Sequence, residues 1–318
     1  MIYTLTLNPS LDYHMHCEQL ELGHTNRSAE EFFLPGGKGI NASLVFENFH
    51  IPSTTLGFVA GFTGRELIRL LHSYNLTTDF VEVAGTTRIN IKFPLQESTE
   101  INAAGPSISA NDIALLYKKL ALLNDGDFLV LAGSLPSGLP ITTYCNIMYY
   151  LSNKRINFVV DTSGEALEHT LSLSPWIVKP NLDELSSFFE RPLHTLEDIK
   201  LCASYLQELG AKNVLVSLGS RGALLLSEDQ QCYYCTAPKG TAINAVGAGD
   251  SMLAGFLIAY HMFSSSKDFF PYETNDRYEY AFMMSIYAGS ASAFSSTFVT
   301  PADIYSLYQE SPLVPSIL

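Results

Sequence analysis

Glycines and charged side chains occur together in two segments of the sequence, a combination typical of anion-binding sites. The segment Gly247-Ala248-Gly249-Asp250 comes just before an apolar stretch, residues 251–262, that is expected to be helical. A glycine turn that enters a helix leaves backbone N–H groups unpaired, and the helix dipole makes that end attract anions. An ionised Asp250 beside such a site could accept the proton of a hydroxyl that attacks a phosphoryl group. The alternative is an ordinary helix start with glycines for close packing.

The second segment, Leu34-Pro35-Gly36-Gly37-Lys38-Gly39-Ile40-Asn41, places three glycines around one lysine. Glycines let the backbone come close to a small polar ligand while the Lys38 ammonium meets an anionic group. A flexible loop is the alternative, but Pro35 and the helical pattern that follows favour a fixed loop. The segment is not a P-loop, because Lys38 is followed by Gly39 rather than by Ser or Thr. The dinucleotide-binding glycine pattern is also missing, since Asn8-Pro9-Ser10 follows the first expected strand.

Short apolar runs that end in polar or glycine-rich turns recur along the chain. They cover residues 2–7, 128–131, 156–160, 176–178 and 214–216, and helical patterns cover residues 110–123, 196–209 and 251–262. Continuous apolar runs separated by helices indicate buried parallel strands in βαβ units. The sequence therefore predicts an α/β fold with a doubly wound, mostly parallel sheet flanked by helices, in which ligands bind at the carboxyl ends of the strands.

One segment, residues 87–93, alternates with period two instead. The alternation sets Arg88, Asn90 and Lys92 on one face of a half-exposed strand and three apolar side chains on the other. Together with the mixed stretch at residues 13–33, it predicts a small sheet that projects from the main domain. We interpret the polar face as an anion-binding wall, and an ordinary solvated strand face is the alternative.

The two glycine segments, in this order and at this separation, resemble the paired signature of the ribokinase-like carbohydrate kinases of the phosphofructokinase B type. The resemblance covers essentially the whole chain. Within the family, residues 7–12, 57–64, 87–92 and 133–136 are most similar to the bacterial 1-phosphofructokinases, to which the tagatose-6-phosphate kinases are closely related. The resemblance implies one ribokinase-like kinase domain over residues 1–318, with a small β lid inserted from roughly residues 12–34 and 86–104.

The resemblance also implies a role for each residue that matches a motif of the family. It makes Asp250 the catalytic base and the backbone of Gly247, Ala248 and Gly249 the anion hole. The sugar-binding positions are Asp12, Gly37, Lys38, Asn41, Arg88, Asn90 and Ser134, with Lys38 and Arg88 anchoring the phosphate that the sugar already carries. The nucleotide positions are Lys179, Asn181, Glu184, Ser217, Gly219 and Gly222. Magnesium is expected to arrive with ATP near Asn181 and Glu184, without a direct protein ligand.

The activity that the resemblance implies is ATP- and magnesium-dependent phosphorylation of a sugar phosphate, with fructose 1-phosphate as the expected acceptor. Tagatose 6-phosphate, fructose 6-phosphate and an unphosphorylated sugar are alternative acceptors. A sugar-phosphate sensor that has kept the fold and lost the chemistry is a more distant alternative, which the intact Asp250 disfavours. The expected partners are the sugar phosphate and ATP, and the lid could also form a homodimer contact.

Composition narrows the remaining classes of protein. The chain has 318 residues, 47% of them hydrophobic, and its 32 acidic against 18 basic residues give a net charge of −14. Such a charge disfavours nucleic-acid and anionic membrane partners. We find no targeting signal at the start and no apolar stretch long enough to span a bilayer, so a cytoplasmic protein is expected. Cys232 and Cys235 have the spacing of a metal-binding or redox pair. The sequence has no second Cys pair or His pair that would complete a metal site, so structural thiols are expected.

Overall fold

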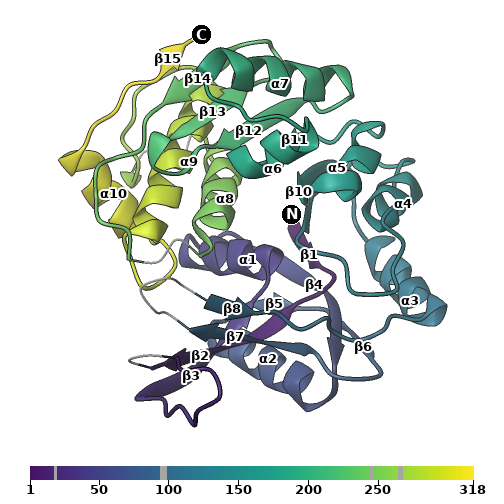
Figure 1. Cartoon of the computed structure of the whole chain (residues 1–318). Helices are drawn as coiled ribbons and strands as arrows, with labels where there is room; N and C mark the ends of the chain where they lie inside the picture. The colour runs from purple at the N-terminus through teal and green to yellow at the C-terminus, as the bar shows by residue number, and fades with distance from the viewer. Residues whose placement is uncertain (18–19, 94–98, 244–245, 264–267) are drawn as a thin grey trace.

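A large, mostly parallel sheet forms the centre of the molecule (Figure 1). The computed structural model describes residues 1–17, 20–93, 99–243, 246–263 and 268–318. In spatial order the strands are β15 (Ser316–Ile317), β14 (Cys232–Cys235), β13 (Ala223–Leu226), β12 (Asn213–Ser217), β11 (Ile177–Val178), β10 (Asn157–Asp161), β9 (Phe128–Ala132), β1 (Ile2–Thr6), β4 (Ser53–Ala60) and β5 (Thr77–Thr78), and β6 (Val81–Val83) also pairs with β4. Pairing is parallel from β12 to β5 and antiparallel from β12 to β15. The order reverses at β1, because the chain first moves outward to β4 and later continues from β9 on the other side. A crevice at such a switch point is where open α/β sheets bind ligands.

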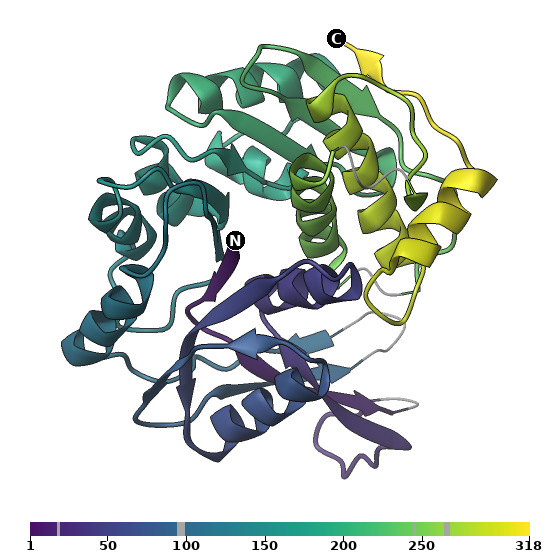
Figure 2. The same ribbon diagram turned by 180° about the vertical axis from the view of Figure 1, so that it is seen from behind.

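Helices cover both faces of this sheet (Figures 1 and 2). One face carries α1 (Lys38–Asn48), α8 (Ala248–His261), α9 (Arg277–Ala293) and α10 (Pro301–Glu310). The other carries α3 (Ala110–Leu120), α4 (Thr143–Tyr150), α5 (Gly164–Leu171), α6 (Leu182–Phe188) and α7 (Leu196–Glu208), while α2 (Gly61–Ser73) packs on β4 and α1. Successive residues of β9 enter opposite core clusters, Val130 on one face and Leu129 and Leu131 on the other. Two buried faces explain why these strands are apolar throughout rather than alternating. Within the described residues, no helix is both long and apolar enough to cross a membrane.

The predicted α/β fold with a mostly parallel sheet is confirmed, and the five predicted buried strands are present with ends shifted by one residue at most places. The helix at the carboxyl-terminal glycine segment begins earlier than predicted, at Ala248 rather than at residue 251. The reason is Gly247, which takes the left-handed conformation at φ 78° and acts as the N-cap. As a result, Ala248, Gly249 and Asp250 form the first turn of α8.

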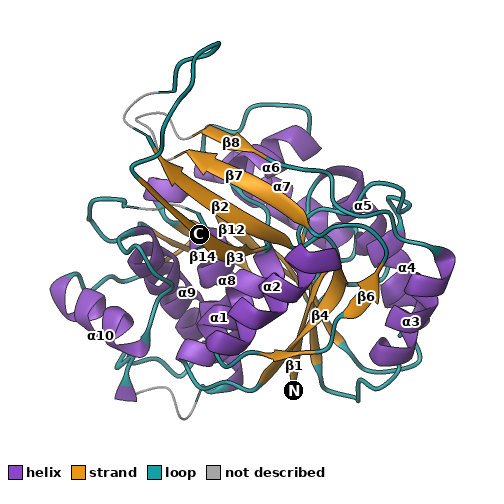
Figure 3. Ribbon diagram, turned by 90° about the horizontal axis from the view of Figure 1, so that it is seen from below, coloured by secondary structure: helices purple, strands orange, loops and turns teal. Residues whose placement is uncertain are grey.

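A second sheet of four strands stands apart from the first (Figure 3). Its order is β3 (Glu30–Gly36), β2 (Ser10–His16), β7 (Arg88–Phe93) and β8 (Thr99–Ile101). β2 and β7 are parallel, with Ser10 opposite Arg88 and Asp12 opposite Asn90. The small projecting sheet is therefore present where the alternating segment predicted it. Residues 18–19 and 94–98 of the predicted lid segments lie outside the described residues.

Cys232 and Cys235 are buried at the two ends of β14, with their side chains in different core clusters. Burial raises the pKa of both thiols, that of Cys235 to about 11. Because their side chains lie in different core clusters, the two thiols do not form a redox or metal-binding pair with each other. The expectation of structural thiols agrees with this arrangement.

Candidate active site

A cavity of about 1150 Å³ lies between the carboxyl ends of the central strands and the small sheet. Both glycine segments and the polar face of β7 line it, and so does every predicted site residue except Glu184. These lining residues are Asp12, Gly37, Lys38, Asn41, Arg88, Asn90, Ser134, Lys179, Asn181, Ser217, Gly219, Gly222, Gly247, Ala248, Gly249 and Asp250. The structure thus brings together segments that are more than 200 residues apart in the sequence.

Two helices, α1 and α8, begin at the cavity with glycine N-caps. Gly37 has φ 128° and Gly247 has φ 78°, and neither helix has a side-chain cap. A Cβ on Gly37 would lie 2.7 Å from Thr6 Cγ2, and one on Gly247 would lie 2.8 Å from Phe298 Cε1. Glycine is therefore required at both positions by conformation and by space. Uncapped N–H groups and the helix dipoles make both helix starts suitable for anions.

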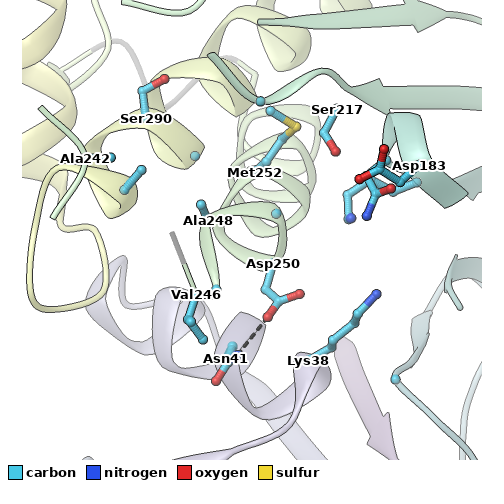
Figure 4. Close-up of a pocket in the computed structure, with 18 of the residues that line it drawn as sticks. Lys38, Asn41, Asp183, Ser217, Ala242, Val246, Ala248, Asp250, Met252 and Ser290 are labelled. Carbon is cyan, nitrogen blue, oxygen red and sulfur yellow. Dashed lines mark hydrogen bonds between the residues drawn. The ribbon is translucent and has the colours of Figure 1, made fainter. Parts of the chain in front are cut away.

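Asp250 links the two helix starts (Figure 4). Asn41 Nδ2, in the first turn of α1, donates a 2.7 Å hydrogen bond to Asp250 Oδ2. Burial and then the negative charge of Asp161 raise the pKa of Asp250 to about 6, although Lys179, the Asn41 bond and Lys38 oppose the rise. A carboxylate with a pKa this close to neutrality is ionised at pH 7 and still basic enough to accept a proton.

Lys38 and Lys179 meet at a carboxylate that the sequence motifs did not single out. Lys38 Nζ donates to Asp161 Oδ1 at 2.9 Å and lies 3.5 Å from Glu184 Oε1. Lys179 Nζ lies 3.2 Å from Asp161 Oδ2. Burial alone would lower the pKa of Lys38, but Asp161 and Glu184 raise it well above its usual range. The structure therefore holds the Lys38 ammonium between Asp161 and Glu184, close enough to Asp250 to feel its charge.

Asp12, on β2 of the small sheet, is held by hydrogen bonds in the cavity wall. Its Oδ1 accepts from Ser10 Oγ at 2.6 Å and from Asn90 Nδ2 at 2.9 Å. Gly36 packs so closely that a Cβ there would lie 2.5 Å from Asp12 Oδ1. Because two donors already occupy Oδ1, Oδ2 is the atom of this carboxylate that can accept a bond from a ligand hydroxyl, and it lies 4.0 Å from the Lys92 ammonium.

Arg88 and Lys92 share the polar face of β7 but differ in their charge balance. Among the described residues, Arg88 donates to two backbone carbonyls, from Nε to Asn8 O at 3.0 Å and from Nη1 to Ala103 O at 3.5 Å. Lys92, by contrast, forms a close ion pair with Glu100. Within the described part of the chain, no carboxylate forms an ion pair with the Arg88 guanidinium. The polar face predicted to bind an anion carries two cations, Arg88 and Lys92. Because Glu100 neutralises Lys92, Arg88 is the cation whose charge is available to a ligand.

Asn181 and Glu184 have a structural role at the start of α6. Glu184 N donates to Asn181 Oδ1 at 2.8 Å, and Asn181 N donates to Glu184 Oε2 at 2.9 Å, which makes a capping box. Glu184 lies behind the cavity wall, where its other oxygen faces Lys38. Asn181 itself lines the cavity.

The far end of the cavity is apolar, and sequence reasoning missed it. Met252, Ile286, Ala293 and Phe294 line this end, together with Pro238. From the sequence alone, Met252, Ile286 and Ala293 are expected to be core residues, because α8 and α9 are apolar along most of their length. Ser217, Gly219 and Gly222 border the same region, and a Cβ on Gly222 would lie 1.9 Å from Cys235 O. An apolar slot next to glycine-rich backbone suits a nucleotide base.

The donor set suits a divalent ion that brings most of its own ligands. In the described parts of the chain, no three His, Cys, Asp or Glu side chains are grouped to hold a metal. Asp183 and Asp250 line the cavity, and Glu184 lies just behind it. Magnesium is usually held by one or two carboxylates, water and substrate phosphates. The residues present therefore fit a magnesium–nucleotide complex better than a resident metal.

Comparison with known proteins agrees with this geometry. The pfkB family of carbohydrate kinases matches residues 5–275. The 1-phosphofructokinase of Bacillus subtilis is 41% identical over 310 residues, 98% of each chain. The D-tagatose-1-phosphate kinase of Bacillus licheniformis is 37% identical over 258 residues, 81% of this chain and 84% of that protein. The structure of phosphofructokinase-2 from Escherichia coli in complex with fructose-6-phosphate has a TM-score of 0.87 and 28% identity, over 98% of both chains.

These matches cover most of the chain, including both glycine segments and the aspartate between the helix starts. They agree in family while the sugars in their names differ. The chain belongs to the pfkB family of carbohydrate kinases, and it is a phosphotransferase that acts on a sugar hydroxyl.

Proposed function

We propose that the protein transfers the γ-phosphoryl group of magnesium-bound ATP to the free primary hydroxyl of fructose 1-phosphate, which yields fructose 1,6-bisphosphate. The observation that carries the proposal is the place of Asp250, in the first turn of α8, beside uncapped amides and two ammonium groups. The relative from Bacillus subtilis that bears the name 1-phosphofructokinase supports this acceptor, since it matches over nearly the full chain.

In the proposed mechanism, Asp250 accepts the proton of the hydroxyl as that oxygen attacks the phosphoryl group in line. Its Oδ2 is held by Asn41, and Oδ1, which accepts no hydrogen bond from the described residues, takes the proton. The backbone N–H groups from Gly247 to Asp250 stabilise the negative charge of the transition state. Magnesium, when bound with ATP, adds to that charge stabilisation.

The sugar phosphate is proposed to lie along the small-sheet wall. Asp12 Oδ2, Asn41, Asn90 and Ser134 offer polar contacts for its hydroxyls, and Gly37 allows close approach. Arg88 is the anchor for the phosphate that the sugar already carries, because its charge has carbonyl oxygens and no carboxylate as partners among the residues that the structure describes. Lys38 is assigned here to the end of the cavity where the phosphoryl group is transferred, rather than to the phosphate of the sugar. Asp161 and Glu184 hold its ammonium at that end.

ATP is proposed to occupy the other half of the cavity, with its base in the apolar slot near Met252 and Phe294. Ser217, Gly219 and Gly222 then border the ribose and phosphates. Lys179 and Asn181 face the phosphates, with magnesium near Asn181 and Glu184. An enzyme that takes ATP and a phosphorylated sugar finds both substrates in the cytoplasm, so we place it there.

The small sheet is proposed to act as a lid within a single kinase domain and as a contact between two copies of the chain. Its face away from the cavity is apolar: Tyr13 and Phe33 stack at 4.4 Å between ring centroids, and Ile101 is paired with Ile91 beside them. Phe33 is 41% and Ile101 56% exposed, so a second copy could bury both. Closure of the other face over the sugar would exclude water and limit wasteful ATP hydrolysis.

The test is a side-by-side coupled assay of ATP turnover with fructose 1-phosphate, tagatose 1-phosphate, fructose 6-phosphate and fructose. The highest kcat/KM is expected for fructose 1-phosphate. Tagatose 1-phosphate is the second candidate, because the matching tagatose kinase is named for the 1-phosphate, whereas the sequence had suggested the 6-phosphate. A preference for fructose 6-phosphate or for fructose would contradict the proposed acceptor. Absence of ATP turnover with every added sugar would favour the non-catalytic sensor.

A further inference from the structure

Asp161, the last residue of β10, is a buried carboxylate that joins the two halves of the candidate active site. Its side chain is 1% exposed and does not line the cavity. Oδ1 accepts a 2.9 Å hydrogen bond from Lys38, and Oδ2 lies 3.2 Å from the Lys179 ammonium as an ion pair without an aligned hydrogen bond. We infer that Asp161 is a positioning residue that holds both ammonium groups beside the path of the transferred phosphoryl group. The inference rests on the proposed kinase function.

The two lysines come from opposite sides of the cavity. Lys38 is the first residue of α1, directly after the small sheet, whereas Lys179 follows β11 on the nucleotide side. A Cβ on Gly249 would lie 3.3 Å from Lys179 Nζ, so this ammonium lies against the first turn of α8. The Lys38 ammonium extends into the cavity near Asp250 (Figure 4). Both cations therefore flank the anion hole and the proposed base.

One carboxylate balances two cations here. Lys179 is 4% exposed, so its charge has left water almost completely. Within the described residues Asp161 is its acidic partner, whereas Lys38 has Glu184 as well. Removing one member of a buried ionic cluster leaves an uncompensated charge, which displaces the remaining groups. Without Asp161, the two ammonium groups would repel each other and Lys179 would lose its fixed position.

The position of this cluster favours a role in the reaction over a role in folding alone. Buried ion pairs add little stability compared with apolar side chains of the same size. The partners of Asp161 are two cavity-lining ammonium groups rather than core residues. Burial would raise the pKa of Asp161, but Lys179 and Lys38 hold it below its usual range. The carboxylate thus remains ionised, as a holder of cations must, and does not exchange protons with substrate.

The experiment compares Asp161→Asn with the native full-length chain, using fructose 1-phosphate and magnesium–ATP. A misplacement of about 1 Å costs roughly 10²-fold in rate, so kcat is expected to fall by about that factor, while KM for the sugar phosphate changes by less than about 3-fold. The acidic limb of the kcat profile is also expected to move to lower pH, because the charge of Asp161 opposes ionisation of Asp250. A purely structural role would not move that limb.

Asp127→Asn is the matched control. Asp127 is also a buried carboxylate in an ion pair, 3.0 Å from the N-terminal ammonium. It directly precedes β9, however, and so lies at the amino-terminal ends of the strands, opposite to the cavity. This variant is expected to lose stability and keep kcat and the pH profile. If Asp161→Asn does not fold, Asp161→Glu replaces it, since Glu keeps the charge and displaces the oxygens. That variant should keep the acidic limb and lose at least about 10-fold in kcat.

Three results would overturn the inference. Native kcat in Asp161→Asn or Asp161→Glu would show that the lysines are positioned without this carboxylate. A loss of activity that high magnesium restores would show that Asp161 acts on the metal ion instead. Absence of sugar-dependent ATP turnover in the native chain would overturn the proposed function together with this inference, whereas an active native enzyme with an equally active variant would overturn only the role of Asp161.

Discussion

Asp250 shows how surroundings adapt an ordinary carboxylate to base catalysis. Its side chain is 7% exposed, and its nearest polar partner is the Asn41 amide. Burial and the charge of Asp161 favour the protonated form, and Lys179 and Lys38 favour the ionised form. The balance leaves a carboxylate that is basic for its type and still charged at neutral pH.

The first prediction concerns the pH dependence of the reaction. The pKa of Asp250 is raised to about 6, and the base works only when ionised. The kcat/KM for the sugar phosphate should therefore be constant above about pH 7, fall to half near pH 6 and drop about 10-fold per pH unit below that. Initial rates from about pH 4.5 to 8.5 measure this profile. A plateau that continued to about pH 5 would be inconsistent with a raised pKa at the base.

The second prediction concerns Arg88. Replacement by Ala removes a charge whose hydrogen-bond acceptors, in the described parts of the chain, are two backbone carbonyl oxygens. Hydrogen bonds to charged groups contribute about 1.5–3 kcal/mol, so KM for the sugar phosphate should rise roughly 10–100-fold with kcat changed much less. Lys92→Met is the comparison, and its effect should be smaller because Glu100 already neutralises Lys92. Equal effects of the two substitutions would move the phosphate site away from Arg88.

At the scale of elements, the start of α8 determines what the first turn can do. Gly247 in the left-handed conformation begins the helix three residues before the apolar stretch. That places Gly249 against the Lys179 ammonium and Asp250 against α1. A helix that began at residue 251, as the apolar pattern alone predicted, would leave these residues in a loop.

The third prediction tests that helix start with a pair of substitutions. Ala in the left-handed region costs roughly 1–2 kcal/mol at either Gly247 or Gly126, because φ is 78° at the first and 87° at the second. Only Gly247 also faces a close neighbour, since a Cβ there would lie 2.8 Å from Phe298 Cε1, whereas a Cβ on Gly126 would meet open space. Both variants should lose thermal stability, but only Gly247→Ala should lose kcat, by at least about 10-fold. An equal kcat in the two variants would separate the helix start from catalysis.

Several elements of the site could be predicted from the sequence because their signals are local. A glycine before a helix, a carboxylate after it and a period-two strand each depend on a few neighbouring residues. Asp161 could not be identified in this way, since an aspartate at a strand end is also an ordinary turn residue and its partners are distant in sequence. The same holds for the apolar slot, because cavity-lining and core side chains on a helix have the same spacing. The pairing of Lys92 with Glu100 depends on the register of β7 and β8, which the sequence does not specify.

At the scale of the molecule, basic residues gather at the cavity although the net charge of the protein is negative. The chain carries −14 overall, with only 18 basic residues. Of those that the structure describes, five line the cavity: Lys38, Arg88, Lys92, Lys179 and Lys239. An acidic protein that takes anionic substrates must gather its cations locally, since its long-range field repels those substrates. Cations from both sheets contribute, so the approach of the small sheet to the main sheet completes the site.

The fourth prediction concerns the proposed contact between copies of the chain. Phe33→Asp places a charge on the apolar outer face of the small sheet and should convert a dimer into a monomer. Tyr149→Asp is the control, because Tyr149 is 71% exposed but lies on α4. Light scattering after gel filtration gives the mass of each variant. A native monomer, or a Phe33→Asp dimer, would exclude this face as the contact.

The most direct test of the central claim is the kcat of Asp250→Asn with the preferred sugar phosphate and magnesium–ATP. Loss of a general base should lower kcat by about 10²–10⁴-fold, with substrate binding retained. Because the folded state raises the pKa of Asp250 to about 6, its ionised form costs stability above that pH, so the melting temperature of Asp250→Asn at about pH 8 should be no lower than that of the native chain. A folded variant with kcat within a few-fold of the native value would contradict the assignment of Asp250 as the base.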